Sequence, residues 1–304
     1  MSNKNIRTIT LKEDQIIPLK FDFEFSGIFN NIDNMIIVEN FVALYLNEPI
    51  SKIRNHVTIK SRNLPINNKD NKDKQVDLLV DLDGEKINIE LNNRQSLGII
   101  DRNVVYVCEV HGKQLKYKDN DYSNISRTIQ INLNNFKCNK NGKLVDTYYL
   151  RNEDGEILTE KFRIDYVDLV NAKENRYNEH EEKLARFCRA INAETMTDFK
   201  KEIGGIMEKK AEDKLIDEVD KYSKDDEVIA LYSAYSREEL ERNTLLKEGK
   251  EKARKEGLAE GRAEGIAEAN LEIAKKMLDL NISISDILKV TSLSENEILA
   301  LKND

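Results

Sequence analysis

Tryptophan is absent from this sequence, and proline, cysteine and histidine occur only three times each. The cysteines, Cys108, Cys138 and Cys188, are odd in number, widely spaced and outside any C-x-x-C pair. That pattern excludes a disulfide framework and indicates no zinc site, so we expect buried free thiols. There is also no P-loop and no G-x-G-x-x-G fingerprint, and nothing therefore indicates the use of a nucleotide cofactor.

Long hydrophobic runs are missing as well. The longest apolar stretch, "MIIVENFVALYL", is interrupted by Glu39 and Asn40 and is too short to span a bilayer. The first ten residues, "MSNKNIRTIT", contain no apolar segment of signal-peptide length. We expect a cytoplasmic protein with no membrane partner.

The formal net charge of −8 argues against bulk coating of nucleic acid, which requires surplus Lys and Arg. Two segments depart from this average. Residues 52–74 hold seven Lys or Arg against Asp70 and Asp73, and residues 111–143 hold seven against Asp119 and Asp121. These segments are either two solvated loops or the two sides of a phosphate-binding groove.

The pattern of apolar residues divides the chain into three regions. Residues 1–172 mix helical and strand-like segments, residues 173–245 are helical, and residues 246–304 hold a Gly/Glu repeat followed by short amphipathic helices. Within the first region, "MIIVENFVALYLN" predicts a buried helix ended by Asn47 and Pro49, whereas "NVVYVCEVHGKQL" fits a helix or a strand. The predicted strands are "HVTIK", "RTIQINLNNF", "VDTYYLRN" and "EKFRIDYVDLV".

Small residues recur every four positions in the C-terminal region, which places them in one stripe along a helix. The stripe is either a helix-pairing seam or a weak, flexible spacer, because each Gly costs about 1 kcal/mol relative to Ala. A helix-turn-helix reading of "ISDILKVTSLSENEI" is disfavoured by its acidic second helix, so we expect a packing or homo-oligomerisation module with a capping box from Ser294 to Glu297. The residues of the stripe are Gly249, Ala253, Gly257, Gly261, Gly265 and Ala269.

The segment "KQVDLLVDLDGEKINIELNNR" predicts a β-hairpin, because an Asp83-Gly84 pair between alternating strands favours a two-residue type I′ turn. One face of this hairpin is aliphatic and is expected to be core. Its pairs are Leu82 with Glu85, Val80 with Ile87, Leu78 with Ile89, and Val76 with Leu91. The pairs on the reverse face are Asp81 with Lys86, Leu79 with Asn88, Asp77 with Glu90, and Gln75 with Asn92.

Asp77 and Glu90 are the unusual pair, because like charges directly opposite each other, with β-carbons about 5 Å apart, destabilise a hairpin. Either both acids point into solvent or they ligate one hard divalent cation, which prefers oxygen ligands. A cation held in this way polarises a phosphodiester oxygen and lowers the pKa of a bound water. Asn92 lies on the same strand face as Glu90, in a position to orient that water.

An Asp in one strand followed by Glu-x-Lys or Glu-x-Gln in the next resembles the core of the PD-(D/E)XK nucleases, here as Asp77 and "ELN" at residues 90–92. Further along the chain, "FDFEFSGIF", "KQLKYKDNDYSNISRTIQINL", "DYVDLV" and the "EG" repeats occur in the same order as in the Rpn family of recombination-promoting nucleases, which are also described as transposases. The resemblance covers nearly the whole chain.

The resemblance implies an α/β fold, a mixed sheet flanked by helices with a helical C-terminal extension. It also implies a bacterial, Mg²⁺- or Ca²⁺-dependent DNA endonuclease linked to recombination, transposition or phage defence, with Asp77 and Glu90 as metal ligands. An early acid in such cores corresponds to Asp22, Glu24 or Glu39, of which Asp22 best matches the family's Asp-x-x-Phe beginning.

Asn92 departs from the family pattern, which has Gln or Lys at this position. An Asn amide cannot stabilise developing negative charge as an ammonium does. The nearest cations on that face of the hairpin are Lys86 and Arg94. A catalytically silent DNA-binding or regulatory protein is therefore the alternative to a nuclease, and an interaction protein acting through residues 246–304 is a third hypothesis.

Overall fold

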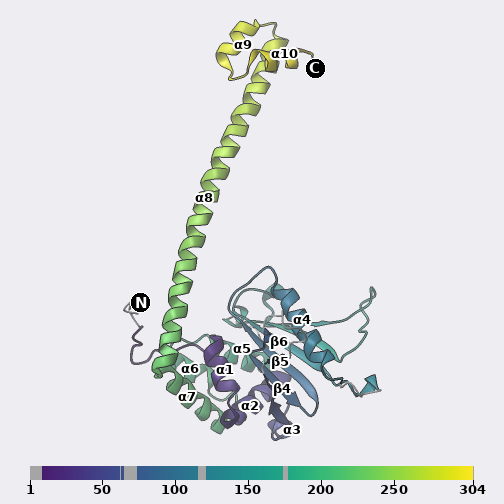
Figure 1. Cartoon of the computed structure of the whole chain (residues 1–304), viewed down its shortest axis with the longest axis vertical. Helices are drawn as coiled ribbons and strands as arrows, with labels where there is room; N and C mark the ends of the chain where they lie inside the picture. The colour runs from purple at the N-terminus through teal and green to yellow at the C-terminus, as the bar shows by residue number, and fades with distance from the viewer. Residues whose placement is uncertain (1–8, 62, 65–73, 116–120, 174–176, 304) are drawn as a thin grey trace. The chain divides into compact units, whose positions relative to one another are not determined.

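The computed structural model describes residues 9–61, 63–64, 74–115, 121–173 and 177–303. The chain divides into two compact units, Met1–Ser233 and Ala234–Asp304. The first unit holds a sheet with helices on both faces, and the second is helical (Figure 1). The mixed sheet flanked by helices, with a helical C-terminal extension, confirms the fold class expected from the sequence.

The main sheet has six strands in the order β1-β4-β5-β6-β8-β7. The two inner pairings, β5 with β6 and β6 with β8, are parallel, and the outer pairings are antiparallel. The predicted strands all form. Their bounds are β1 Val57–Ile59, β4 Leu78–Leu82, β5 Glu85–Asn92, β6 Thr128–Asn134, β7 Val145–Tyr149 and β8 Phe162–Asp168, beside a small separate pair, β2 Asn63–Leu64 and β3 Lys74–Gln75.

The hairpin of β4 and β5 has the predicted turn and register. Asp83 and Gly84 have φ values of 49° and 99°, which is the left-handed backbone that a type I′ turn requires. Five pairs match the expectation: Leu82 with Glu85, Asp81 with Lys86, Val80 with Ile87, Leu79 with Asn88, and Leu78 with Ile89.

The hairpin ladder ends at Leu78 because the chain bends at Asp77. The predicted pair of Asp77 with Glu90 is therefore not part of the ladder, and the two predicted pairs beyond the bend are wrong. Gln75 pairs with Asn63 instead of Asn92, and Val76 packs with Leu79 and Val110 instead of on the aliphatic face with Leu91. The bend reverses the alternation of side chains, so the residues before it face the opposite side of the sheet.

One face of the sheet forms the main core of the first unit. Helices α1 (Asp22–Phe29), α2 (Met35–Leu46) and α5 (Glu179–Ile191) pack on this face (Figure 1). Helix α2 ends as predicted, with Asn47 at φ 55° as its left-handed C-cap. The strand residues that meet these helices are aliphatic: Leu78, Val80, Ile87, Ile89, Ile129, Ile131 and Leu133.

The other face is covered by α4 (Ile99–Gly112), which resolves the helix-or-strand ambiguity of this segment in favour of a helix. Asn103, Val107 and Val110 of this helix are buried against the sheet. As a result β5 is buried on both faces. Glu90 is only 4% exposed. The alternative in which the Glu90 carboxylate points into solvent is therefore excluded.

The remaining helices of the first unit include three whose buried residues join the main core, α3 (Ile50–Ile53), α6 (Met196–Ile203) and α7 (Lys209–Ser223). The unit also holds the beginning of α8 (Asp226–Asp279) and short 3-10 turns at Ile32–Asn34, Tyr122–Asn124, Lys140–Gly142 and Asn171–Lys173. Helix α5 begins with a capping box in which Asn178 and Glu181 exchange side-chain and backbone hydrogen bonds. Buried Ser223 accepts a 2.9 Å hydrogen bond from the backbone N–H of Ile17, tying the N-terminal segment to α7.

The second unit consists of the rest of α8 followed by α9 (Ile284–Val290) and α10 (Glu295–Asn303). Ala274, Ile287 and Ile298 form its small core. The predicted capping box is present, because the Ser294 backbone N–H donates to Glu297 at 2.6 Å and the Glu297 N–H donates to Ser294 Oγ at 3.4 Å. The Gly stripe lies along the exposed part of α8, and its role as a seam or a spacer stays a prediction.

Several predictions about single features have mixed outcomes. Cys188 is buried and Cys138 half-buried, but Cys108 is exposed, because α4 turns this position away from the sheet.

No helix in the described part of the chain combines the length and the hydrophobicity that a bilayer span needs. The basic segments include residues 65–73 and 116–120, which lie outside the described residues, so both alternatives for these segments, solvated loops or a phosphate-binding groove, stay open.

Glu24 of α1 generates a prediction about stability. It is fully buried near Tyr222, and within the described part of the chain neither of its carboxylate oxygens has a hydrogen-bond partner. Burial raises the pKa of Glu24 well above its ordinary value, so folding takes up a proton. This bound proton stabilises the folded state. Its contribution is complete at pH values below the ordinary pKa of a glutamate, and it is lost as the pH rises through the raised pKa of Glu24.

We expect Glu24→Gln, which stays neutral, to raise the free energy of unfolding by about 1–3 kcal/mol at pH 8 and by less at pH 4. Urea denaturation at both pH values measures the difference. Glu13→Gln, at an exposed acid, is the control and should change little at either pH. An equal effect of Glu24→Gln at both pH values would contradict the assignment.

Candidate active site

Asp77 is held from two sides at the bend between β3 and β4. Its backbone carbonyl accepts hydrogen bonds from Ser26 Oγ at 3.2 Å and from Asn30 Nδ2 at 2.7 Å, both from α1 and its C-cap. Its carboxylate Oδ2 accepts a 2.7 Å hydrogen bond from the backbone N–H of Leu91 in β5. The carboxylate therefore lies beside β5, one residue beyond the end of the regular ladder.

Glu90 lies next to Asp77, although the strands no longer pair there. Burial and the charge of Asp77 raise the pKa of Glu90 to about 8, while the nearby charge of Arg102, the Asn88 amide and the backbone N–H of Asp77 lower it in part. The structure thus brings together the two acids whose opposition the sequence predicted. It buries one of them almost completely.

Arg102 of α4 is a site residue that the sequence did not single out. Its guanidinium donates a short hydrogen bond to Asn92 Oδ1 and lies 5.8 Å from the centre of the Tyr106 ring. Because its charge also acts on Glu90, Arg102 is a cation at the edge of the acid pair. It belongs to a different element from the hairpin, and no spacing in the sequence links it to Glu90.

Asn92 uses both atoms of its amide within the protein. Its Oδ1 accepts from Arg102, and its Nδ2 donates to Asn134 Oδ1 at 3.0 Å. The other cations considered from the sequence lie elsewhere. The ammonium of Lys86 binds the Asp81 carboxylate and the Gly84 carbonyl at the turn, and Arg94 lies half-buried beyond the end of β5.

The three candidates for the early acid have different environments. Asp22 is exposed at the start of α1, four and eight residues before Ser26 and Asn30, and therefore lies along the helix face that holds Asp77. Glu24 is buried near Tyr222 of α7. Glu39 accepts a 2.8 Å hydrogen bond from the backbone N–H of Asn55, so it supports a turn. Asp22 remains our choice among the three.

A ladder of buried amides surrounds the acid pair on the face of the sheet below α4. Asn88 Nδ2 donates to Gln130 Oε1 at 2.7 Å, and Gln130 Nε2 donates to Asn132 Oδ1 at 3.1 Å. Asn132 lies directly beside Glu90 in the parallel register of β5 and β6. The sequence signal for this ladder is "TIQINLN", in which amide residues alternate with aliphatic residues. When both faces of such a strand are buried, its amides need other polar groups beside them as hydrogen-bond partners.

The donor set of the site fits a hard divalent cation. Two carboxylates come together where one is buried with a raised pKa, and a cation between them replaces their repulsion with attraction. Among the described residues no group of three or more His, Cys, Asp or Glu side chains converges on one point. A pair of carboxylates suits Mg²⁺, which keeps several waters, better than Ca²⁺, which takes six to eight oxygen ligands.

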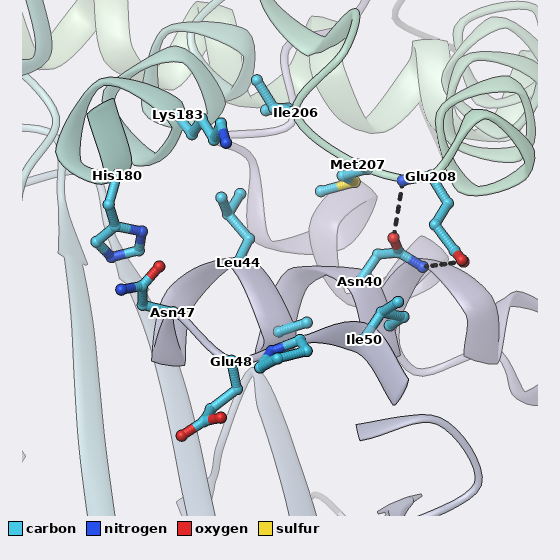
Figure 2. Close-up of a pocket in the computed structure, with 12 residues that line it drawn as sticks. Asn40, Leu44, Asn47, Glu48, Ile50, His180, Lys183, Ile206, Met207 and Glu208 are labelled. Carbon is cyan, nitrogen blue, oxygen red and sulfur yellow. Dashed lines mark hydrogen bonds between the residues drawn. The ribbon is translucent and has the colours of Figure 1, made fainter. Parts of the chain in front are cut away.

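Apart from the acid pair, the structure has a cavity of about 510 Å³ between the C-terminal end of α2, the start of α5 and the segment before α7 (Figure 2). Asn40 closes one side of it by accepting a 3.0 Å hydrogen bond from the backbone N–H of Glu208. Its charged side chains are engaged in ion pairs, Glu48 with Lys52, Lys183 with Glu179, and Glu208 with Arg54. Its lining residues do not include Asp77 or Glu90.

Comparison with protein-family models gave a match over residues 19–249, to the family described as PD-(D/E)XK nuclease family transposase. The matched residues include α1, the β4–β5 hairpin, α4 and the acid pair. Neither the comparison with curated proteins nor that with solved structures gave a match.

The hydrogen bond from Leu91 to Asp77 predicts how substitutions at this acid behave. Asp77→Ala leaves the backbone N–H of Leu91 without its acceptor, and we expect it to lower the free energy of unfolding by about 1–3 kcal/mol. Asp77→Asn keeps an oxygen in place and should cost less than Asp77→Ala. Urea denaturation compares the two, and equal losses of stability would show that the hydrogen bond contributes nothing.

Proposed function

We propose, from the premise that the chain belongs to the PD-(D/E)XK nuclease family transposases, that it is a DNA endonuclease that depends on a divalent cation. A nuclease- or transposase-like role follows from the family itself. The observation that supports the finer proposal is the pair of half-buried Asp77 and buried Glu90, with the Arg102 cation at its edge. Recombination, transposition and phage defence are the processes in which we place this activity.

In this proposal Asp77 and Glu90 hold the cation, preferably Mg²⁺. When bound, the cation supplies Lewis acidity that polarises a phosphodiester oxygen and lowers the pKa of an attacking water. Asp77 is oriented for this role by its bonds to Leu91, Ser26 and Asn30, so its carboxylate does not need to reorganise. Asp22, from the same face of α1, is the proposed third acid.

Arg102 supplies a positive charge next to Asn92, the position at which the family pattern has Gln or Lys. The hydrogen bond to Asn92 Oδ1 fixes the guanidinium beside Glu90, and the remaining N–H groups can donate to a phosphate oxygen. Asn92 then positions Arg102 and does not itself orient the water. Asn92 Nδ2 donates to Asn134 Oδ1, so the buried amide of Asn134 sets the orientation of the Asn92 side chain.

A second candidate function is a catalytically silent protein that binds DNA or regulates through its helical tail. The observation that favours it is Asn92, whose amide is bonded on both sides and carries no charge. This candidate predicts DNA binding that weakens steeply with salt and produces no nicks.

The full-length protein should nick or linearise supercoiled plasmid with Mg²⁺ and should not do so with EDTA. We expect Asp77→Asn and Glu90→Gln each to reduce cleavage by at least 100-fold, because each removes a proposed cation ligand. Agarose gel electrophoresis of the plasmid measures this.

Asp83→Asn is the matched control for both variants. It neutralises an exposed acid of the same hairpin and leaves an Asn-Gly turn, so its activity should equal that of the parent. Cleavage that persists in the Asp77 and Glu90 variants, or that is absent from the parent with every metal, would contradict the proposal.

Arg102→Gln should slow cleavage about 100-fold while leaving the Mg²⁺ affinity, measured by calorimetry, within a few-fold of the parent. Adding Asn92→Lys to this variant should restore part of the rate, because the charge returns to nearly the same place. Lys113→Gln, at the other end of α4, is the control. A full rate in Arg102→Gln would show that this guanidinium takes no part.

A further inference from the structure

A smaller cavity, of about 370 Å³, opens on the sheet face that α4 covers. It has three walls. Ile99, Ile100 and Val104 of α4 form one, Phe136 and its neighbours in the loop after β6 form another, and the side chains of β7 and β8 form the third. None of its lining residues belongs to the acid pair, and the proposed cleavage chemistry does not use them.

The wall from β7 and β8 is an aromatic corner. The rings of Tyr148 and Tyr166 meet edge to face, with centroids 5.6 Å apart and planes at 80°. Tyr148 is 54% exposed on β7, at the edge of the sheet, so one ring surface remains open. Large exposed aromatic surface on a rigid strand is suited to stacking against a flat ligand.

The position of the cavity relates it to the acid pair. Glu90 pairs in register with Asn132, and Asn132 pairs with Tyr166 on the same sheet face. Two strand spacings, about 10 Å, therefore separate the backbones of Glu90 and Tyr166. The cavity and the acids lie on either side of the first turns of α4, which carry Ile100 and Val104 toward the cavity and Arg102 toward the acids.

The polar groups of the cavity also suit a nucleic acid. Lys137 is an exposed cation at its margin, and the exposed amide of Gln95 supplies groups that can hydrogen-bond. A purely apolar metabolite would not use Lys137. The combination of a flat aromatic wall, aliphatic residues opposite it and one cation matches one nucleotide of a single strand.

We propose that this cavity binds an unstacked nucleobase of the DNA strand whose backbone passes the acid pair, with the base stacked on Tyr148. The identity of the strand rests on the proposed function, whereas base binding itself does not require cleavage. The subsite would let the protein prefer DNA that is already single-stranded or locally opened, since a base in intact duplex must first be unstacked and unpaired.

The test is a binding measurement with the full-length protein in EDTA, so that a lack of nuclease activity cannot affect it. The probe is a single-stranded DNA oligonucleotide containing 2-aminopurine, whose fluorescence falls when the base stacks on an aromatic ring. We expect quenching on binding, tighter binding of the single strand than of its duplex, and about tenfold weaker binding by Tyr148→Ala.

Two variants control for loss of structure. Tyr148→Phe keeps the stacking ring and should bind like the parent. Tyr149→Ala removes the next tyrosine of β7, which pairs with Arg163 and faces the other side of the sheet, and it should also bind like the parent. Unchanged affinity and quenching in Tyr148→Ala, equal affinity for an abasic oligonucleotide, or tighter binding of the matching RNA would each overturn the proposal.

Discussion

The structure of the site depends on the burial of a carboxylate in a strand that has no solvent-exposed face. Glu90 is covered on one side by the helices of the main core layer and on the other by α4, and isolated burial of its charge would be costly. Several polar and charged groups around Glu90 reduce this cost. Asn88 and the backbone of Asp77 hydrogen-bond it, Arg102 offsets its charge, and the amides of β6 continue the hydrogen-bonded layer.

The bend at Asp77 follows from the same requirement. A regular strand would place the Asp77 side chain opposite Glu90 and leave the backbone N–H of Leu91 for an ordinary ladder bond. Instead the Asp77 carboxylate accepts that N–H, and α1 binds the Asp77 carbonyl through Ser26 and Asn30. Ending the ladder at Leu78 thus fixes one acid beside the other and attaches the hairpin to α1, where Asp22 lies.

The substitution of Asn for the family's Lys or Gln has a structural counterpart in Arg102. A Lys at position 92 would place its charge on the same strand as Glu90, whereas Arg102 brings charge from the opposite layer through a hydrogen bond to Asn92. Helix α4, which carries Arg102, separates the acid pair from the aromatic cavity, so α4 positions both the proposed cleavage chemistry and the proposed base site.

The sequence by itself determined the turn of the hairpin and the register of its five pairs, because the Asp83-Gly84 pair between two apolar strands favours a two-residue loop. It also determined the other strands of the main sheet and the buried helix α2, whereas the segment of α4 fitted a helix or a strand. Only the tertiary structure decided that Glu90 is buried, that Val76 faces the other side of the sheet, and that Arg102 joins the site. Each of these depends on α4 and α1 packing against the hairpin, and contacts between elements far apart in the chain leave no periodic trace in the sequence.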